Sequence, residues 1–213
     1  MNQPFYWSRL CVLAGLLSVG TPPIGAHDFL TGYVQHRVEL TVGAKHIDVT
    51  LRLTFFEDGS EHERRHMDSN NDGRLSRAEV QSYAEEVELT SEKNVKLEID
   101  GRPVSLITLY PPDVDLLGES RVGRERHVLT LHLFARTPAE LGAGAEVRIQ
   151  DELWPELRAI PSLHVAGRDG SRLEPNRTIH GVLADGKEAI LFAARVLKPP
   201  VPATSSTSAP GKP

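Results

Sequence analysis

The chain has 213 residues, a formal net charge of −5, 39% hydrophobic residues and one cysteine. This length is enough to build one hydrophobic core. The charge is mildly negative and no basic block is present, so we expect no binding to nucleic acid or to an anionic membrane surface. The single cysteine, Cys11, lies near the N-terminus, so we expect no disulfide in the folded domain.

The first 26 residues have the pattern of a secretory signal peptide. Leu10 to Val19 is a short apolar run, Pro22-Pro23 breaks it, and Ala26 offers a small residue for cleavage before His27. The run is shorter than the roughly 20 residues that a membrane-spanning helix needs. An uncleaved anchor is the alternative. We therefore expect residues 1–26 to be removed and the mature chain, without a transmembrane segment, to be exported to a periplasm or secreted.

Alternating apolar and polar residues predict β-strands after the signal. Val34 to Val42 and Ile47 to Phe55 each alternate with period two, which is typical of two half-buried strands in a hairpin. Further short strands separated by turn residues are expected at Val95–Ile99, Pro103–Tyr110, His127–Ala135, Ala145–Gln150, Ser162–Ala166, Thr178–Leu183 and Glu188–Leu197. A loop is expected from Pro111 to about Arg126.

A helix–loop–helix is expected within this series of strands, at residues 60–90. Ser60 with Glu63 forms a capping-box pattern, so a first helix should begin there and end near Met67. A second helix should start near Arg77 and fade between Thr90 and Asn94. The sequence thus predicts a mainly β, antiparallel sandwich-like domain over residues 27–197 with this insertion. Residues 198–213, rich in Pro, Ser, Thr and Ala, are expected to be disordered.

The most specific motif runs from Asp68 to Glu79 and matches the pattern D-x-[DN]-x-[DN]-G-x5-E at every specified position. Calcium takes about six to eight oxygen ligands, which this loop type supplies in a fixed order. Gly73 permits the sharp turn with positive φ. The bland alternative is a solvated polar turn. The expected ligands are the side chains of Asp68, Asn70, Asp72, Ser76 and Glu79 and the backbone carbonyl of Arg74.

The calcium loop has no partner in the sequence. EF-hand loops normally pair through their eighth position, which is Leu75 here, and the segment that starts at Asp113 lacks the required residues at its fifth and twelfth positions. Whether Leu75 packs on the sheet or pairs with another molecule is open at this stage. We expect a structural calcium clip, with a dissociation constant of about 10⁻⁵ to 10⁻³ M.

Histidines suggest two other metal sites. His62-Glu63-Arg64-Arg65-His66 matches H-E-x-x-H, in which two histidines on one helix face bind zinc and the glutamate activates water. Glu85 or Glu86 could supply a third ligand. Because arginines fill the intervening positions, a solvated helix face is the competing interpretation.

The second suggestion is copper binding by His27. Cleavage after Ala26 would leave His27 as a free N-terminal residue, and a free amine with an imidazole can chelate copper. His36 would be the second histidine, because it lies on the apolar face of its strand. A core histidine with a satisfied hydrogen bond is the alternative for His36.

The order of these features resembles a known class of exported domains. The resemblance rests on Ala26-His27, Thr54-Phe55-Phe56, the loop from Asp68 to Glu79, and Leu97-Glu98-Ile99-Asp100-Gly101. It is to exported bacterial domains linked to nickel/cobalt exporters and to permeases of the hydrogenase/urease accessory type. The resemblance implies a β-rich periplasmic region with an EF-hand-like loop that assists metal transport, with a membrane metal transporter as partner.

The sequence has no Gly-x-Ser-x-Gly and no phosphate-binding loop. We therefore expect a non-enzymatic exported protein that binds calcium, and whose partner, if any, is another protein. Two alternatives stay open: a periplasmic accessory for nickel or cobalt, and a zinc-dependent hydrolase acting through His62, Glu63 and His66.

Overall fold

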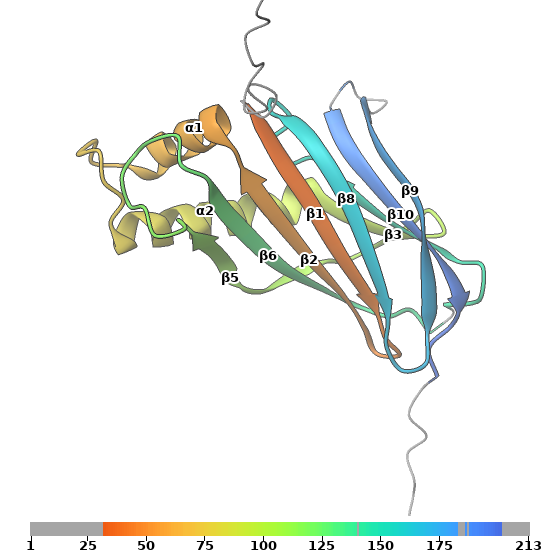
Figure 1. Ribbon diagram of the computed structural model, residues 1–213. Coiled ribbons are helices and arrows are strands. Elements are labelled where there is room, and N and C mark those ends of the chain that lie inside the picture. Colours follow the sequence, from red (N-terminus) through yellow and green to blue (C-terminus); the bar gives the residue numbers. More distant parts are fainter. Residues whose placement is uncertain (1–31, 140, 183–185, 187, 202–213) are drawn as a thin grey trace, which may run out of the picture.

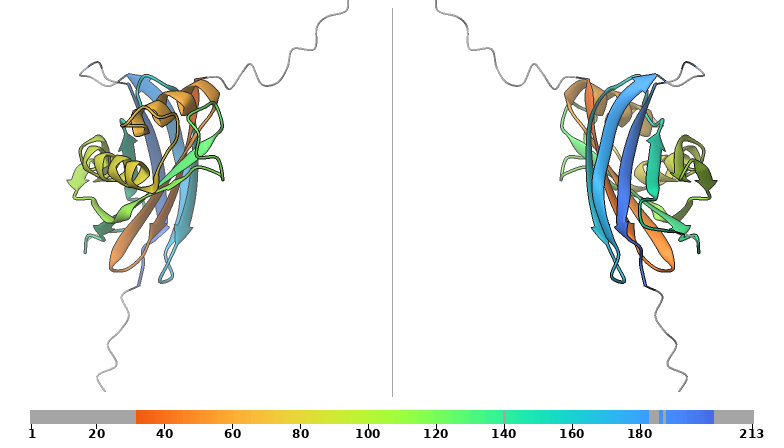
Figure 2. Two further views of the ribbon diagram at one scale, coloured as in Figure 1. Left: turned by 90° about the vertical axis from the view of Figure 1, so that its left-hand side faces the viewer. Right: turned by 90° about the vertical axis from the view of Figure 1, so that its right-hand side faces the viewer.

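The computed structural model describes residues 32–201, apart from residues 140, 183–185 and 187. The expected signal peptide, Cys11, His27, the end of the strand expected at Thr178–Leu183 and residues 202–213 of the expected tail lie outside the described residues. The described part forms a two-layer β-sandwich with two helices at one end (Figures 1 and 2). None of its helices combines the length and the apolar character that crossing a membrane requires. The sandwich-like β fold expected from the sequence is confirmed.

Each layer is a five-stranded sheet. The first has the order β5-β6-β2-β1-β8, and all its neighbours are antiparallel except β1 and β8, which are parallel. Its strands are β1 (Tyr33–Val42), β2 (His46–Phe55), β5 (Ile107–Asp115), β6 (His127–Arg136) and β8 (Arg158–Gly167). The second has the order β4-β3-β7-β10-β9. Its strands are β3 (Val95–Ile99), β4 (Arg102–Val104), β7 (Glu146–Asp151), β9 (Arg172–Val182) and β10 (Glu188–Lys198).

The expected hairpin is present as β1 and β2. The pairing runs from Val34 opposite Phe55 to Val42 opposite Ile47, so the apolar members of both strands face the same side. That side is buried against the second sheet, because alternate side chains of a strand point to opposite faces. The core between the layers includes Leu51 and Leu131 from the first sheet and Leu97, Ile149 and Phe192 from the second.

The insertion is longer than expected from the sequence. It comprises α1 (Glu57–Met67) and α2 (Arg77–Asn94), so it spans residues 57–94 instead of 60–90. The capping box expected at Ser60 is wrong, because Ser60 lies inside α1 and its hydroxyl donates to the Glu125 carbonyl at 2.5 Å. The capping box that does form is at the start of α2, between Ser76 and Glu79.

The segment expected as one strand from Pro103 to Tyr110 is divided between the two sheets. Its first part is β4 at the edge of the second sheet, and its last part belongs to β5 at the edge of the first. β5 continues through Pro111 and Pro112 to Asp115, with irregular register on both sides of Tyr110. Proline has no N–H to donate, but an edge strand tolerates it. The loop expected from Pro111 is therefore shortened to residues 116–126.

A buried side-chain pair joins the two sheets. His36 on β1 and Asp151 on β7 are both buried, and the His36 Nδ1 lies 2.6 Å from the Asp151 Oδ2. The other oxygen of Asp151 accepts the Leu153 N–H at 3.0 Å. His36 is therefore a core histidine with a satisfied Nδ1, as the alternative interpretation expected, and its ring is not directed to solvent.

We predict that Asp151→Ala lowers the free energy of unfolding by about 3 kcal/mol, because it leaves the His36 ring and the Leu153 N–H buried without their acceptor. Urea unfolding measures the change. Asp113→Ala removes an exposed carboxylate of the same kind and should stay within about 0.5 kcal/mol of the wild type. Equal losses in the two variants would contradict the role given to Asp151.

Candidate functional site

Residues 68–79, which we call the acidic loop, comprise the connection between α1 and α2 and the first turn of α2, at the end of the sandwich. Its polar side chains fold back on the backbone of the loop. The Asp68 carboxylate accepts the N–H groups of Asp72 at 3.1 Å and of Gly73 at 2.9 Å. The Asn70 side-chain oxygen accepts the Asp72 N–H at 2.8 Å, and an Asp72 oxygen accepts the Arg74 N–H at 2.8 Å. Successive oxygen-bearing side chains are thus turned toward the interior of the loop.

Two residues with positive φ make this turn possible. Asn71 has φ 58° and Gly73 has φ 77°. Asparagine and glycine are the residues that adopt this region at least cost. A Cβ on Gly73 would meet no atom within 4 Å, so the need for glycine there is conformational and not a matter of space.

Glu79 closes the loop from the first turn of α2. One carboxylate oxygen accepts the Ser76 N–H at 2.9 Å, and the other accepts the Ser69 hydroxyl at 3.2 Å and the Asn70 N–H at 3.3 Å. The hydrogen bonds from Ser76, followed by those from Asn70 and Ser69, lower the pKa of Glu79 from 4.5 to about 2. The carboxylate is therefore ionised at neutral pH and lies across both ends of the loop.

The donor set of the acidic loop suits a hard cation. All the expected ligands offer oxygen, and a carboxylate that accepts one or two hydrogen bonds keeps further lone pairs. Asp68 and Glu79 are each only 7% exposed, whereas Asn70, Asp72 and Ser76 are exposed. Within the part of the chain that the structure describes, no three His, Cys, Asp or Glu side chains form a group that could hold a metal ion. The carboxylates of Asp68, Asp72 and Glu79 thus do not gather as a set of three, and each accepts hydrogen bonds from the backbone of the loop.

The acidic loop has a partner within the same chain, which the sequence did not indicate. The Leu75 N–H donates to the Ser120 carbonyl at 2.6 Å, and the Val122 N–H donates to the Gly73 carbonyl at 3.0 Å. Arg74 lies between these two bonds in an antiparallel bridge with Arg121. Leu75 is buried in the main core cluster, and Val122 packs against that cluster. The question left open for Leu75 is thus answered: it packs on the core and pairs with residues 116–126.

Arg64 fixes this pairing segment to α1. It is fully buried, and its guanidinium donates to four backbone carbonyls. The acceptors are Glu119 at 2.7 Å, Arg121 at 2.9 Å, Leu116 at 3.0 Å and Arg126 at 3.2 Å. Burial lowers the pKa of Arg64, and Glu125 and Glu119 oppose that shift. The guanidinium keeps its charge, because arginine is not deprotonated in proteins.

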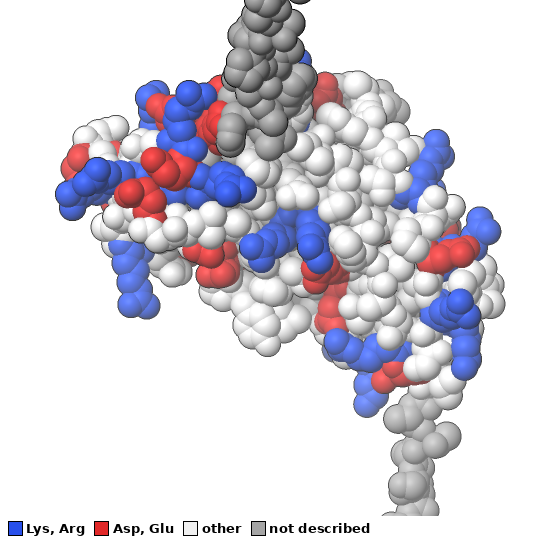
Figure 3. All heavy atoms as spheres, viewed as in Figure 1, with Lys and Arg blue, Asp and Glu red and all other residues white. Residues whose placement is uncertain are grey.

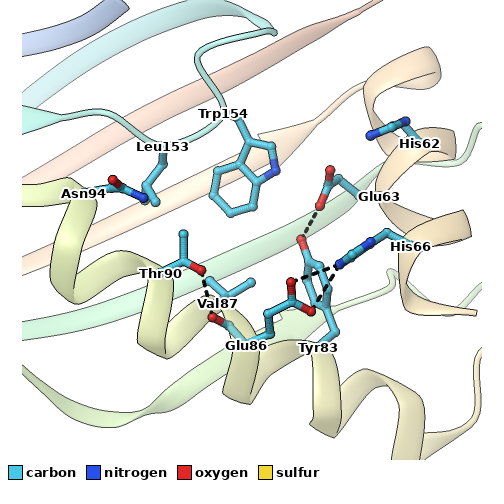
Figure 4. Close-up of a pocket in the computed structure, with 10 residues that line it drawn as sticks. All are labelled: His62, Glu63, His66, Tyr83, Glu86, Val87, Thr90, Asn94, Leu153 and Trp154. Atoms are coloured by element: carbon cyan, nitrogen blue, oxygen red, sulfur yellow. Dashed lines mark hydrogen bonds and ion pairs between the residues drawn. The ribbon is translucent and has the colours of Figure 1, made fainter. Parts of the chain in front are cut away.

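The H-E-x-x-H residues line a groove between α1 and α2 (Figure 4). Glu63 is buried and accepts the Tyr83 hydroxyl at 2.5 Å. Burial, followed by the charge of Glu63, raises the pKa of Tyr83 well above its usual value, so the phenol keeps this proton. The His66 Nε2 lies 3.1 Å from a Glu86 oxygen, and the His62 ring lies apart from this pair.

The two histidines of this motif lie on an exposed helix face, as the competing interpretation expected, but the residues between them do not all face solvent. His62, Arg65 and His66 are exposed. Glu63 is buried and contacts Tyr83 of α2, whereas Arg64 is buried and contacts residues 116–126. Of the two glutamates considered as a third ligand, the structure places Glu86 beside His66, whereas Glu85 accepts a hydrogen bond from Gln81. The floor of the groove is apolar and contains Val87, Leu153 and Trp154.

Charged side chains of both signs gather at the end of the molecule that carries the helices (Figure 3). One contribution comes from Arg124, which forms ion pairs with Glu57 and Asp58 at the start of α1. It adds a second, exposed connection between residues 116–126 and α1.

Comparison with models of known protein families and with curated protein sequences gives no match. The fold and the site define the chain as a two-sheet β-sandwich with a helix–loop–helix inserted between β2 and β3. More particularly, it is a sandwich whose inserted acidic loop is paired with a second loop of the same chain, residues 116–126.

We predict that Glu79 makes stability depend on acid pH. Its folded pKa lies below the ordinary value, so its contribution is present above about pH 4.5 and is lost as the pH falls toward about 2. In chelator, the melting temperature of Glu79→Gln should be below that of the wild type at pH 6, and the difference should shrink toward pH 2. Glu85→Gln, an exposed change on the same helix, should show no such trend. A difference for Glu79→Gln that is constant with pH would contradict this assignment.

Proposed function

We propose that the protein is a non-enzymatic calcium-binding protein in which one calcium ion in the acidic loop stabilises the helix–loop–helix on the sandwich. The observation that supports this best is that the oxygen-bearing side chains of the acidic loop fold back on the backbone of the loop, in the order that a calcium loop requires. Asp68, Asn70 and Asp72 turn their side-chain oxygens into the loop, and the ionised Glu79 lies across it. The backbone carbonyl of Arg74 and the side chain of Ser76 would complete a coordination of about six to eight oxygens.

A structural role is favoured over that of a switch. A sensor loop exposes an apolar groove when its two helices separate. Here the facing sides of α1 and α2 are joined by a buried hydrogen bond between Tyr83 and Glu63 and by the contact of His66 with Glu86. Opening the helices would leave the Glu63 carboxylate without its donor, which costs free energy for a buried group. The ion would therefore stabilise one arrangement.

The expected cellular location agrees with this function. The signal-peptide pattern predicts export, and an exported protein meets far more calcium than a cytosolic one. Extracellular modules bind calcium with dissociation constants of about 10⁻⁴ to 10⁻³ M, within the range expected for this loop. A weak site of this kind is filled outside the cell and needs no high affinity.

We predict that calorimetric titration gives about one calcium ion per wild-type chain, and that calcium raises the melting temperature relative to chelator. Glu79→Gln should weaken binding at least tenfold, because it removes the charged ligand that contacts both ends of the acidic loop. Glu85→Gln changes the same charge on the exposed face of α2 and should bind like the wild type. A melting temperature that is equal in calcium and in chelator would refute the structural role.

A second candidate function, transition-metal handling for a membrane transporter, is supported by one observation. The His66 Nε2 and the Glu86 carboxylate are 3.1 Å apart, close to the separation of about 3.0–3.4 Å for two ligands each about 2.1 Å from one metal. His62 lies one turn away on the same helix and could join them by a change of rotamer. The zinc-hydrolase alternative has less support, because its proposed base, Glu63, is hydrogen-bonded to Tyr83.

Titration with nickel, cobalt or zinc tests this candidate. If the groove binds such an ion, the double variant His62→Ala/His66→Ala should lose at least tenfold in affinity while its calcium binding is unchanged. The variant His164→Ala/His180→Ala removes two histidines from the strands β8 and β9 and should keep the wild-type affinity. An equal loss in both double variants would indicate binding by surface histidines in general.

A further inference from the structure

We propose that residues 116–126 are the second half of the calcium-binding unit, and that the buried Arg64 is a positioning residue that sets calcium affinity from outside the coordination sphere. This inference rests on the calcium binding proposed above. Residues 116–126 would then be the partner that EF-hand loops normally have. Arg64 would affect calcium affinity without being a calcium ligand.

The pairing geometry carries the first part of the proposal. Residues 116–126 meet the acidic loop through an antiparallel bridge between Arg121 and Arg74, the seventh position of the loop. The eighth position, Leu75, donates its N–H to the Ser120 carbonyl beside this bridge. The hydrogen bonds from Leu75 to Ser120 and from Val122 to Gly73 lie on either side of Arg74, whose carbonyl is an expected calcium ligand. The direction of that carbonyl is thus determined by the bridge as well as by the loop.

The buried guanidinium carries the second part. The four carbonyls that Arg64 contacts are distributed over the whole segment, from Leu116 to Arg126. Two further connections between the segment and α1 are the hydrogen bond from the Ser60 hydroxyl to the Glu125 carbonyl and the exposed ion pairs of Arg124. Only a group with several donors in a fixed plane can satisfy this many acceptors at once, which is a property of arginine. Without Arg64 these carbonyls would lose the donor that joins all four of them to α1.

A continuous set of contacts therefore leads from Arg64 to the ion site. Arg64 positions the carbonyls of Glu119 and Arg121, which flank Ser120. Ser120 and Val122 then position Gly73 and Leu75, and these enclose the carbonyl of Arg74. Loss of Arg64 should therefore release residues 116–126 from α1. The backbone around Arg74 would then lose its fixed position in the acidic loop.

The sign of the effect separates positioning from simple electrostatics. A nearby positive charge repels calcium, so removal of an arginine that acts only by its charge should strengthen calcium binding. Removal of an arginine that positions the acidic loop should weaken it. Arg65 provides the control, because it lies on the same helix and carries the same charge, but its side chain is exposed and pairs only with Glu61 among the described contacts.

The test is calorimetric calcium titration of the mature chain as wild type, Arg64→Met and Arg65→Met, at one ionic strength. We expect the dissociation constant of Arg64→Met to rise at least tenfold, and that of Arg65→Met to stay within about twofold of the wild type or to fall. Binding by Arg64→Met that equals or exceeds that of Arg65→Met would overturn the proposal.

Val122→Pro tests the same idea without disturbing a buried charge, in case Arg64→Met does not fold. Proline removes the N–H that donates to the Gly73 carbonyl and leaves Arg64 in place. We expect at least a tenfold loss of calcium affinity and faster hydrogen exchange at the Leu75 amide, and wild-type values of both would overturn the proposal. Failure of the wild type to bind calcium would refute the proposed function and this inference together. Wild-type binding with unaffected variants would refute this inference alone.

Discussion

The arrangement of this molecule at its helical end depends on one buried cation. The Arg64 guanidinium is enclosed by four carbonyls and has no carboxylate among its hydrogen-bond acceptors in the described contacts. A charge removed from water is costly unless dipoles or counter-charges surround it, so the backbone of residues 116–126 must stay close to α1. Burial, and after it the charge of Arg64, lowers the pKa of His127 to about 3. Since the Ser60 hydroxyl donates to the Glu125 carbonyl, the neutral ring of His127 must donate its Nδ1 proton to Ser60.

Local patterns predicted the elements of the fold well, and long-range contacts escaped them. The alternation in β1 and β2 and the loop pattern from Asp68 to Glu79 are properties of neighbouring residues, so the strands and the turn could be expected from the sequence. The hydrogen bond from Leu75 to Ser120 and the contacts of the buried Arg64 join positions more than 40 residues apart, and no periodicity in the sequence predicts them. The start of α1 was misplaced because Ser60, a good N-cap residue, uses its hydroxyl in a tertiary contact.

The sequence H-E-R-R-H has a structural explanation that does not require catalysis. Successive positions of α1 face different neighbours: Glu63 contacts α2 through Tyr83, Arg64 contacts residues 116–126, and Arg65 points to solvent beside Glu61. Because α1 lies between α2 and residues 116–126, its successive residues must suit different surroundings. A short motif can therefore match a metalloprotease pattern for reasons of packing, and only the direction of each side chain separates the two explanations.

The parallel pairing of β1 with β8 has a consequence for the order in which the chain can fold. β1 is the first strand of the described chain, but it lies inside its sheet with β2 on one side and β8 on the other. The neighbour β8 is complete only at Gly167, after β2, both helices and the strands β3 to β7 have been made. Such non-local pairing gives a high contact order and slow folding. The first sheet therefore cannot close during the early part of synthesis, and β1 waits for its β8 neighbour until residue 167 has been made.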